Sequence, residues 1–405
     1  MVDSVEPVRP GTHNAVLAGF LGWTFDAFDF FVLTFVLAPI AAEFGKTLPA
    51  MTLTIAASLA TRWIGAILFG LLADRYGRRI PLVINILYYS LIEVLSGLAP
   101  DYRTFFFLRL LYGIGMGGEW GVGASLTMES IPARWRGLIS GLLQEGYALG
   151  FLLAAGAYRL VYPHWGWRPL FFVGGLPALL TLFVRAKVKE PEAWHRSRSD
   201  WASYRRAIFG NWQRFAYLVV LMAMVNFISH GTQDMYPTYL QHQHGFSPQR
   251  TSDVTAFAMV GAICGGLAFG YFSDYRGRRL AMVTALLLGC LLIPIWVFAP
   301  NLPLILAGGF LMQFMVQGAW GVIPAHINEL SPDTLRGFFP GFAYQLGVLI
   351  ASGSAYFEAR MAHFMSYGRA MGLFALIVLV AGAIVVCFGP EEHRVVFGRG
   401  GSAVG

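Results

Sequence analysis

The chain has 405 residues, of which 56% are hydrophobic and only 13% are charged. Soluble globular proteins carry about 25% charged residues, so this composition excludes a soluble protein of this length. The formal net charge of +7 would suggest nucleic acid in a soluble domain, but in a membrane protein the positions of the basic residues set topology. We therefore expect an all-α integral membrane protein that contacts the lipid bilayer and binds no nucleic acid.

Apolar stretches of roughly 20 residues, enough to cross about 30 Å of hydrocarbon as a helix, recur along the whole chain. Short connections with Pro or Gly separate most of them, as at Ala99-Pro100 and Ala299-Pro300. The twelve predicted transmembrane helices lie near residues 14–42, 51–73, 80–99, 104–127, 137–160, 169–186, 214–240, 251–273, 280–299, 303–326, 338–360 and 370–388.

The long connection between Arg185 and Arg214 is rich in arginine and lysine. By the positive-inside rule it lies in the cytoplasm. Because the number of crossings is even, both termini are expected there too. We predict a multi-pass protein of the plasma (cell inner) membrane.

The second half of the chain repeats the first. Gly70-Leu-Leu-Ala-Asp74-Arg75-Tyr-Gly77-Arg78-Arg79 returns as Gly270-Tyr-Phe-Ser-Asp274-Tyr275-Arg276-Gly277-Arg278-Arg279, and 274 − 74 = 200. The same offset relates Trp120-Gly121-Val122 to Trp320-Gly321-Val322. We therefore predict two pseudo-symmetric six-helix halves, residues 1–186 and 214–405, joined by a cytoplasmic linker, residues 187–213. Transporters built in this way hold the substrate between the halves and rock one half against the other.

The repeated Asp-Arg-x-Gly-Arg-Arg pattern places an acid and several guanidinium groups at a helix end. A topology signal would explain the arginines but leaves the repeated glycine and aspartate unexplained, so we expect a charge latch between helices. Glu129 with Arg136, and Glu329 with Arg336, are expected in the same layer. The predicted cytoplasmic gating residues are Asp74, Arg75, Arg78, Glu129, Arg136, Asp274, Arg278, Glu329 and Arg336.

Arg62 lies twelve residues before Asp74, since 74 − 62 = 12. At about 1.5 Å per helical residue it is about 18 Å from the cytoplasmic end, near mid-membrane. A cation at that depth needs a permanent carboxylate or an anionic substrate. The planar guanidinium suits a substrate carboxylate held by two contacts, and the competing interpretation is an internal pair with Asp26, Asp29 or Glu93.

Asp26 and Asp29 lie within the first predicted helix and are candidates to carry a coupled proton or to pair with Arg62. Gln144 and Glu145 in the first half align with Tyr344 and Gln345 in the second. Gln144, Tyr344 and Gln345 are candidate substrate-binding residues, and Glu145 is a candidate proton carrier. The glycines around them equally fit simple tight packing.

A polar run from Asn226 to Thr238 interrupts an apolar stretch. If the run is helical, Asn226, His230 and Asp234 share one face. Ionisable groups at membrane depth are costly and usually face a bundle interior, so this face is a candidate site, with Asn226 and His230 binding substrate and Asp234 carrying a proton. The alternative is a polar contact between helices.

The three cysteines lie inside apolar stretches without metal-ligand spacing. We therefore expect no metal and no disulfide. No nucleotide-binding loop or nucleophile–base spacing is present in the sequence, so we expect no cofactor and no enzymatic activity.

The two copies with Asp-Arg-x-Gly-Arg-Arg after the second and eighth helices resemble the major facilitator superfamily over essentially the whole chain. Phe25-Asp26-Ala-Phe-Asp29-Phe-Phe and Arg62-Trp63 resemble its sialate:proton symporter branch. The polar run is similar to the Asn-x-x-(Ser/Thr)-His-x-x-Gln-Asp-x-x-x-Thr signature of Jen-type lactate and pyruvate permeases. That signature is met by Asn226, Ser229, His230, Gln233, Asp234 and Thr238.

The resemblance implies a proton-coupled symporter of short monocarboxylates such as lactate, pyruvate or acetate, working by alternating access. Arg62 and Gln345 occupy places that resemble substrate-affecting positions of those permeases. A symporter for a larger acid, such as sialate or an aromatic acid, is the alternative. A non-transporting nutrient sensor is a third interpretation. The partners are then a small carboxylate and protons, and the chain is expected to act as a monomer.

Overall fold

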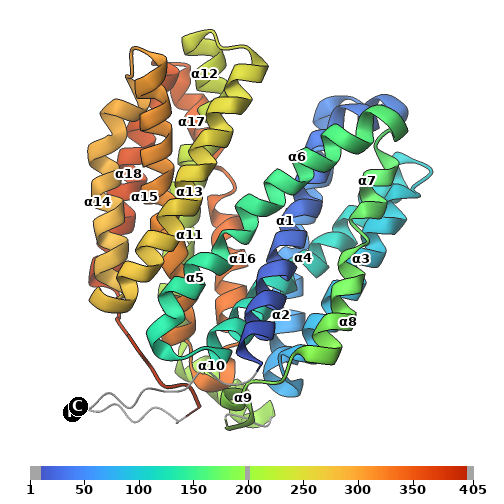
Figure 1. Ribbon diagram of the computed structural model, residues 1–405, viewed down its shortest axis with the longest axis vertical. Helices are drawn as coiled ribbons and strands as arrows, with labels where there is room; N and C mark the ends of the chain where they lie inside the picture. The colour runs from blue at the N-terminus through green and yellow to red at the C-terminus, as the bar shows by residue number, and fades with distance from the viewer. Residues whose placement is uncertain (1–10, 197–200, 399–405) are drawn as a thin grey trace.

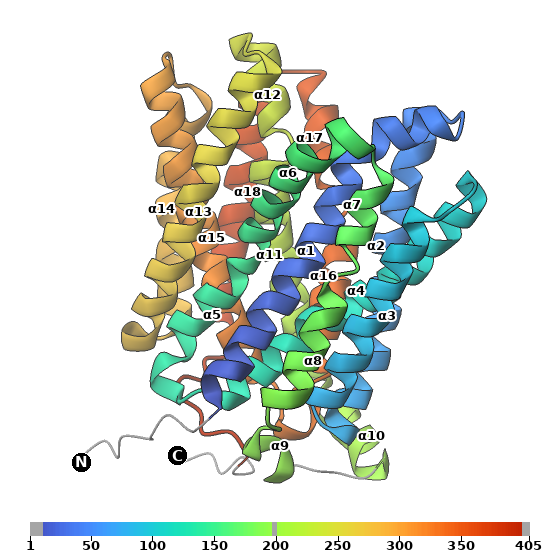
Figure 2. The same cartoon turned by 45° about the vertical axis from the view of Figure 1, so that its right-hand side comes forward.

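The computed structural model describes residues 11–196 and 201–398, and both chain termini, predicted to be cytoplasmic, lie outside the described residues. Within these ranges the fold is helical. Figure 1 shows two helical bundles that meet at one end and separate toward the other. We call the end where the bundles meet the closed end; α1 begins there and α18 ends there (Figure 2).

The helices follow the repeat of the sequence. The first bundle contains α1 (Thr12–Glu43), α2 (Leu48–Tyr76), α3 (Arg79–Gly97), α4 (Tyr102–Ser130), η1 (Ala133–Trp135), α5 (Arg136–Gln144), α6 (Gly146–Trp165), α7 (Arg168–Val173) and α8 (Pro177–Lys187). The connection contains α9 (Glu192–Arg196) and α10 (Trp201–Gly210). The second bundle contains α11 (Trp212–Gln233), α12 (Tyr236–His244), α13 (Pro248–Arg276), α14 (Arg278–Val297), α15 (Leu302–Leu330), η2 (Asp333–Leu335), α16 (Phe339–Ala351), α17 (Ser354–Ala362) and α18 (Tyr367–Phe388).

Ten segments of the described residues are long and apolar enough to cross a membrane. The fourth predicted crossing is helix α4, 29 residues long. Its mean hydropathy is lower than that of the ten segments because Arg109, Glu119 and several glycines occupy its interior. The eleventh crossing is divided into α16 and α17.

Four of the predicted crossings contain a break in the helix. Most of the breaks lie at glycines, which fit a helix interior poorly, or just before Pro237, which cannot donate a backbone hydrogen bond. The breaks separate α5 from α6 at Glu145, α7 from α8 at residues 174–176, α11 from α12 at residues 234–235, and α16 from α17 at residues 352–353.

Helices α2 and α4 cross so closely that only hydrogen fits at the contact. A Cβ atom added to Gly65 would lie 1.7 Å from the carbonyl oxygen of Ile114, and one added to Gly117 would lie 1.7 Å from that of Arg62. The equivalent contact between α13 and α15 is formed at Gly265, where the added atom would lie 1.9 Å from the Phe314 carbonyl oxygen. These contacts fix the depth of Arg62 in the first bundle.

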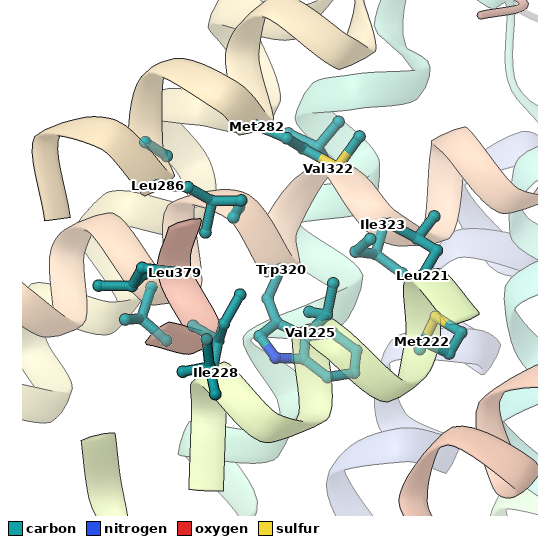
Figure 3. Close-up of a cluster of buried hydrophobic side chains, with 14 of the residues drawn as sticks. Leu221, Met222, Val225, Ile228, Met282, Leu286, Trp320, Val322, Ile323 and Leu379 are labelled. Carbon is teal, nitrogen blue, oxygen red and sulfur yellow. The ribbon is translucent and has the colours of Figure 1, made fainter. Parts of the chain in front are cut away.

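The second bundle has a continuous apolar core around α11. Figure 3 shows Ile228 of α11 near Leu286 of α14 and Leu379 of α18, with Val225 and Leu221 further along α11. All five side chains are buried. Because these apolar residues occupy one side of α11, its polar residues are left on the remaining surface of the helix.

We predict that Gly65→Ala lowers the thermal stability of the purified protein. Alanine normally favours a helix over glycine, but here its methyl group would collide with backbone, which costs about 1–3 kcal/mol. Gly156→Ala in α6 is the matched control, because nothing lies within 4 Å of its added Cβ atom. Equal midpoints for the two variants in thermal unfolding would contradict the close contact.

Candidate functional site

The two bundles touch through helices that carry the repeated motifs. Helix α5 packs on α13 and α15, and α16 packs on α2 and α4. Hydrogen bonds cross this contact. Ala325 N–H donates to Ser140 Oγ at 2.9 Å, and Gln345 Nε2 donates to the Gly117 carbonyl at 3.4 Å. We call this contact, from the closed end up to Gln345, the seam.

Asp74 joins the two bundles at the closed end. One carboxylate oxygen accepts from Arg78 Nη1 at 2.6 Å and from the backbone N–H of Gly337 at 2.6 Å. The other oxygen accepts from the Phe338 N–H at 3.0 Å and from the Tyr204 hydroxyl at 2.9 Å. Asp74 therefore caps the beginning of the partner bundle's α16 region.

Asp274 repeats this arrangement in the second bundle. It accepts from Arg278 Nη1 at 2.8 Å and from the backbone N–H groups of Gly137 and Leu138 at 2.7 and 2.9 Å. Arg278 also contacts Glu329, and Arg78 contacts Glu129 in the same way. The repeated motif thus forms a latch between the halves.

The glutamates and arginines of the latch form ion pairs across the seam. Arg136 pairs with Glu329 at 2.9 Å, and Arg336 pairs with Glu129 at 3.4 Å. Each arginine was expected in one layer with the glutamate of its own half. In the structure each of these arginines pairs with the glutamate of the other half. Arg75, another predicted gating residue, is half-buried at the end of α2. Separating the halves at the closed end must break both cross-pairs.

Two glutamates of the latch were not predicted. Glu190 accepts from the backbone N–H groups of Arg78 and Arg79, both at 2.8 Å, and Glu391 accepts from Arg278 N–H at 2.6 Å. Burial raises the pKa of Glu190, although those N–H groups and the Arg78 charge oppose the shift. The Glu-Pro-Glu and Gly-Pro-Glu-Glu segments that follow α8 and α18 were the available sequence signal.

Arg62 differs from every other buried arginine of the described residues because it forms no ion pair there. Its Nε and Nη2 have no hydrogen-bond partner. Its guanidinium carbon lies 5.8 Å from the centre of the Tyr344 ring, across the seam. A buried, unpaired guanidinium is costly, so this position favours an anion from outside the chain.

Aromatic rings from both bundles surround Tyr344. Its ring centre lies 4.6 Å from that of Trp120, 5.8 Å from Trp320 and 6.4 Å from Trp23. Tyr147 stacks on Trp23 at 5.8 Å. Sequence reasoning included Tyr344 but missed the other four rings, although the repeat of Trp120 and Trp320 was visible.

The first bundle contains a group of buried carboxylates. Asp26 and Asp29 are fully buried, and none of their carboxylate oxygens has a hydrogen-bond partner. Glu93 pairs with Arg109 at 2.7 Å, so it does not pair with Arg62. Glu119, which was not predicted, accepts from Asn85 at 3.2 Å. Asp26 interacts electrostatically with Arg62 but forms no ion pair with it.

The polar run is helical up to Gln233, as predicted. His230 Nδ1 lies 3.1 Å from Asp234 Oδ2, and both side chains are 39% exposed. The Asn226 amide donates to the Met222 carbonyl of its own helix at 2.7 Å. In the described part of the chain, no hydrogen bond or ion pair joins Arg62 to Asn226 or His230.

Gln144 and Glu145 lie at the break between α5 and α6. Gln144 accepts from the Trp120 indole N–H at 3.4 Å. Glu145 is buried in the seam, where its Oε1 has no hydrogen-bond partner. It packs so closely on Gly266 of the other bundle that an added Cβ atom there would lie 2.0 Å from Oε1.

Comparison with known proteins identifies the family. The model of the Major Facilitator Superfamily matches residues 19–252 and 226–398. This chain belongs to the Major Facilitator Superfamily. It is therefore a transporter and not an enzyme. The solved structure of the superfamily's proton:xylose symporter XylE, with 6-bromo-6-deoxy-D-glucose, matches with a TM-score of 0.79 at 18% identity and covers 96% of this chain and 98% of that one. The predicted fold is confirmed.

Several superfamily members are similar in sequence. A carboxylic acid transporter protein homolog of Saccharomyces cerevisiae is 30% identical over 377 residues, and the match covers 86% of this chain but 61% of the relative. The chain thus spans about three-fifths of that relative's length. A probable 4-methylmuconolactone transporter of Cupriavidus pinatubonensis is 30% identical, covering 97% of this chain and 94% of the relative. The sialic acid transporter NanX of Escherichia coli is 28% identical, covering 94% and 95%.

We predict that Asp274→Asn loosens the closed end. The neutral side chain loses its charge-assisted bonds to Arg278 and to two backbone N–H groups, each worth about 1.5–3 kcal/mol. A cysteine introduced as Ser140→Cys in the seam should then be alkylated faster by N-ethylmaleimide. Asp253→Asn, an exposed position on the same helix α13, is the control. An unchanged alkylation rate in the Asp274 variant would show that the latch does not hold the seam closed.

Proposed function

We propose that this chain is a proton-coupled symporter of short monocarboxylates such as lactate, pyruvate or acetate, working by alternating access. The observation that carries the proposal is Arg62, the one buried arginine of the described residues that lacks an ion pair. The names of the relatives support an acid as substrate, because they include a carboxylic acid and sialic acid.

The substrate carboxylate would bind Arg62 through two parallel hydrogen bonds, which a planar guanidinium can donate. Arg62 and Asn226 lie at similar depths. Arg62 is about 18 Å from Asp74, and Asn226 is about 21 Å from the beginning of α11 at Trp212, both near the closed end. Tyr344, Gln345 and Gln144 lie on or beside the seam next to this level and would contact the rest of a small acid. Asn226 can donate to the substrate only if it releases the Met222 carbonyl.

The closed end would face the cytoplasm. The arginines of both copies of the latch and the basic connection between the bundles lie at this end, as the positive-inside rule requires of the cytoplasmic side. On this orientation the bundles are separated on the outer side, and the substrate would enter from outside. Breaking the latch would then release it inward.

Protons would couple to this movement through buried carboxyl groups. Glu145 is the best placed of the candidates because it lies in the seam. While the seam is closed, an ionised Glu145 would be buried without a compensating partner, which is costly, so the protonated form is favoured. Opening the closed end would expose the group to cytoplasmic water and allow it to release the proton. Asp26 and Asp29 are the other buried candidates.

His230 and Asp234 could take part in the same coupling. An ionised carboxylate can only accept, so the Nδ1 of His230 must carry the proton that faces Asp234. In the neutral ring, Nε2 is then an acceptor and cannot donate to a carboxylate. Only the protonated ring can donate from Nε2, so a carboxylate bound there would require a proton to bind with it.

An aromatic acid is a second candidate substrate. The Tyr344 ring lies 5.8 Å from the Arg62 guanidinium carbon. It contacts the rings of Trp23, Trp120 and Trp320, and Tyr147 stacks on Trp23, so this cluster offers planar faces to a planar ligand. The name of the Cupriavidus relative, a probable 4-methylmuconolactone transporter, is compatible with a ligand larger than lactate. Uptake of labelled lactate, pyruvate, acetate, benzoate and sialate into proteoliposomes, with and without an inward proton gradient, distinguishes the two. Uptake of none of these acids would contradict the proposed function.

We predict that Arg62→Lys weakens substrate binding about ten- to a hundredfold. The ammonium keeps the charge but cannot form the two parallel hydrogen bonds, a loss of about 1.5–3 kcal/mol. Calorimetry on purified, monodisperse protein measures the dissociation constant for the best transported acid. Arg103→Lys, an exposed position at the beginning of α4, is the control and should bind as the unmodified protein does. Wild-type affinity in Arg62→Lys would remove Arg62 from the site.

We predict that Glu145→Gln abolishes accumulation driven by a pH gradient while it preserves exchange of substrate across the membrane. The amide fills the same space but carries no exchangeable acid proton, so transport continues without coupling. Proteoliposomes with Asp26→Asn, Asp29→Asn and Asp234→Asn are tested in parallel, and Glu192→Gln, whose side chain is 55% exposed on α9, is the control. Normal accumulation by Glu145→Gln, with loss in one of the aspartate variants, would assign the proton to that aspartate.

A further inference from the structure

The segment after α18 crosses the closed end and contacts both bundles. Arg394 Nη2 donates to the Asp274 carbonyl at 3.1 Å, and the Gly398 N–H donates to Asp333 at 3.1 Å, both within the second bundle. Between these contacts, the Val395 carbonyl accepts from Arg136 of the first bundle at 3.0 Å. The segment from Glu391 to Gly398 contains no helix, so these contacts hold it in place.

Phe397 is the buried residue of this segment, with 7% of its surface exposed. The guanidinium carbon of Arg136 lies 3.7 Å from the centre of its ring, and that of Arg336 also lies 3.7 Å away. One arginine belongs to each bundle, and both are almost fully buried. The two cations therefore share one aromatic ring between the bundles.

This arrangement depends on the electrostatics of the ring. Arg136 and Arg336 carry like charges and would repel each other across an aliphatic side chain. The face of an aromatic ring is negative, so a phenyl group attracts a cation, most strongly when the contact is desolvated. The same arginines form the cross-pairs with Glu329 and Glu129, so moving the bundles apart would break the ring contacts and the ion pairs together.

We propose that Phe397 is a lock for the closed end: held between Arg136 and Arg336, it biases the transporter toward the conformation in which the seam is closed. The inference rests on the proposed function only in that the closed end opens during transport. The contact of Phe397 with the two arginines lies outside the repeated motifs. It would set the balance between the conformations with the seam closed and with the seam open. Arg394 corresponds to Trp194 of the first half at the offset of 200 residues. Trp194 donates to the Asp74 carbonyl at 2.8 Å, and Arg394 donates to the Asp274 carbonyl in the same way.

The test measures the conformational balance directly, without substrate. Two spin-label pairs are introduced after replacing Cys264, Cys290 and Cys387 with serine. Ile80→Cys with Leu280→Cys reports on the closed end, and Leu98→Cys with Phe298→Cys reports on the opposite end. All four positions are exposed and lie at equivalent places on α3 and α14 or immediately after them.

We expect Phe397→Ala to increase the population with long Ile80–Leu280 distances and short Leu98–Phe298 distances. The ratio of the two conformations should change about five- to thirtyfold, equivalent to about 1–2 kcal/mol at 1.4 kcal/mol per factor of ten. Phe397→Trp keeps a ring and should resemble the unmodified protein, whereas Phe397→Leu should resemble Phe397→Ala. Phe388→Ala, at the end of α18 where the side chain is 85% exposed, is the matched control and should change neither distance.

Unchanged distances in Phe397→Ala would overturn the lock. So would wild-type behaviour of Phe397→Leu, because it would assign the effect to apolar packing alone. If Phe397→Ala is not monodisperse, the comparison of Phe397→Leu with Phe397→Trp decides. Since no substrate is present, an error in the proposed substrate or in proton coupling would leave these distances unaffected and would appear only in the uptake experiments.

Discussion

A charge buried at membrane depth needs a compensating partner, and this requirement organises the whole molecule. Six arginines are buried in the described residues, and five of them form ion pairs. Four of the five are at the closed end, where their partners hold the two bundles together. Arg109 stabilises the interior of the first bundle through Glu93. Arg62 alone has no ion pair among the described residues, and for this reason we propose that it binds the substrate.

The latch combines two kinds of contact that respond differently to movement. Asp74 and Asp274 each accept hydrogen bonds from backbone N–H groups of the other bundle, and these hydrogen bonds are short and directional. The cross-pairs of Arg136 and Arg336 join opposite charges of the two bundles, at 2.9 and 3.4 Å. Close glycine contacts, such as Gly121 on Gly341, bring the backbones near enough for both. A transition that opens the closed end must therefore break all of these contacts at once, which favours two discrete conformations.

The candidate site and the latch are connected through the seam. Glu145 lies in it, Tyr344 extends from it to Arg62, and Phe397 closes its outer edge. A ligand that binds Arg62 and contacts Tyr344 would act on both bundles at the same level. Proton loss from Glu145 would require the seam to open. The same contact surface can thus relate substrate, proton and conformation without a separate coupling element.

The sequence by itself determined the membrane class, the twelve crossings, the two-fold repeat and most members of the latch. The hydropathy of the sequence indicates where each crossing begins and ends. The offset of 200 residues identifies equivalent positions in the two halves without any knowledge of their contacts. Arg62 could be identified because its depth follows from helical rise alone. The i, i+4 contact of His230 with Asp234 is equally local.

Only the tertiary structure decided which charges meet. The way in which the bundles dock determines three features: the ion pairs of Glu129 and Glu329 with arginines of the other half, the ring cluster around Tyr344, and the position of Phe397. The helix break at Glu145 was not predicted, because hydropathy averaged over about 20 residues does not detect a single broken turn. Sequence periodicity describes one helix at a time, whereas ion pairs across the seam depend on distances between residues about 200 positions apart.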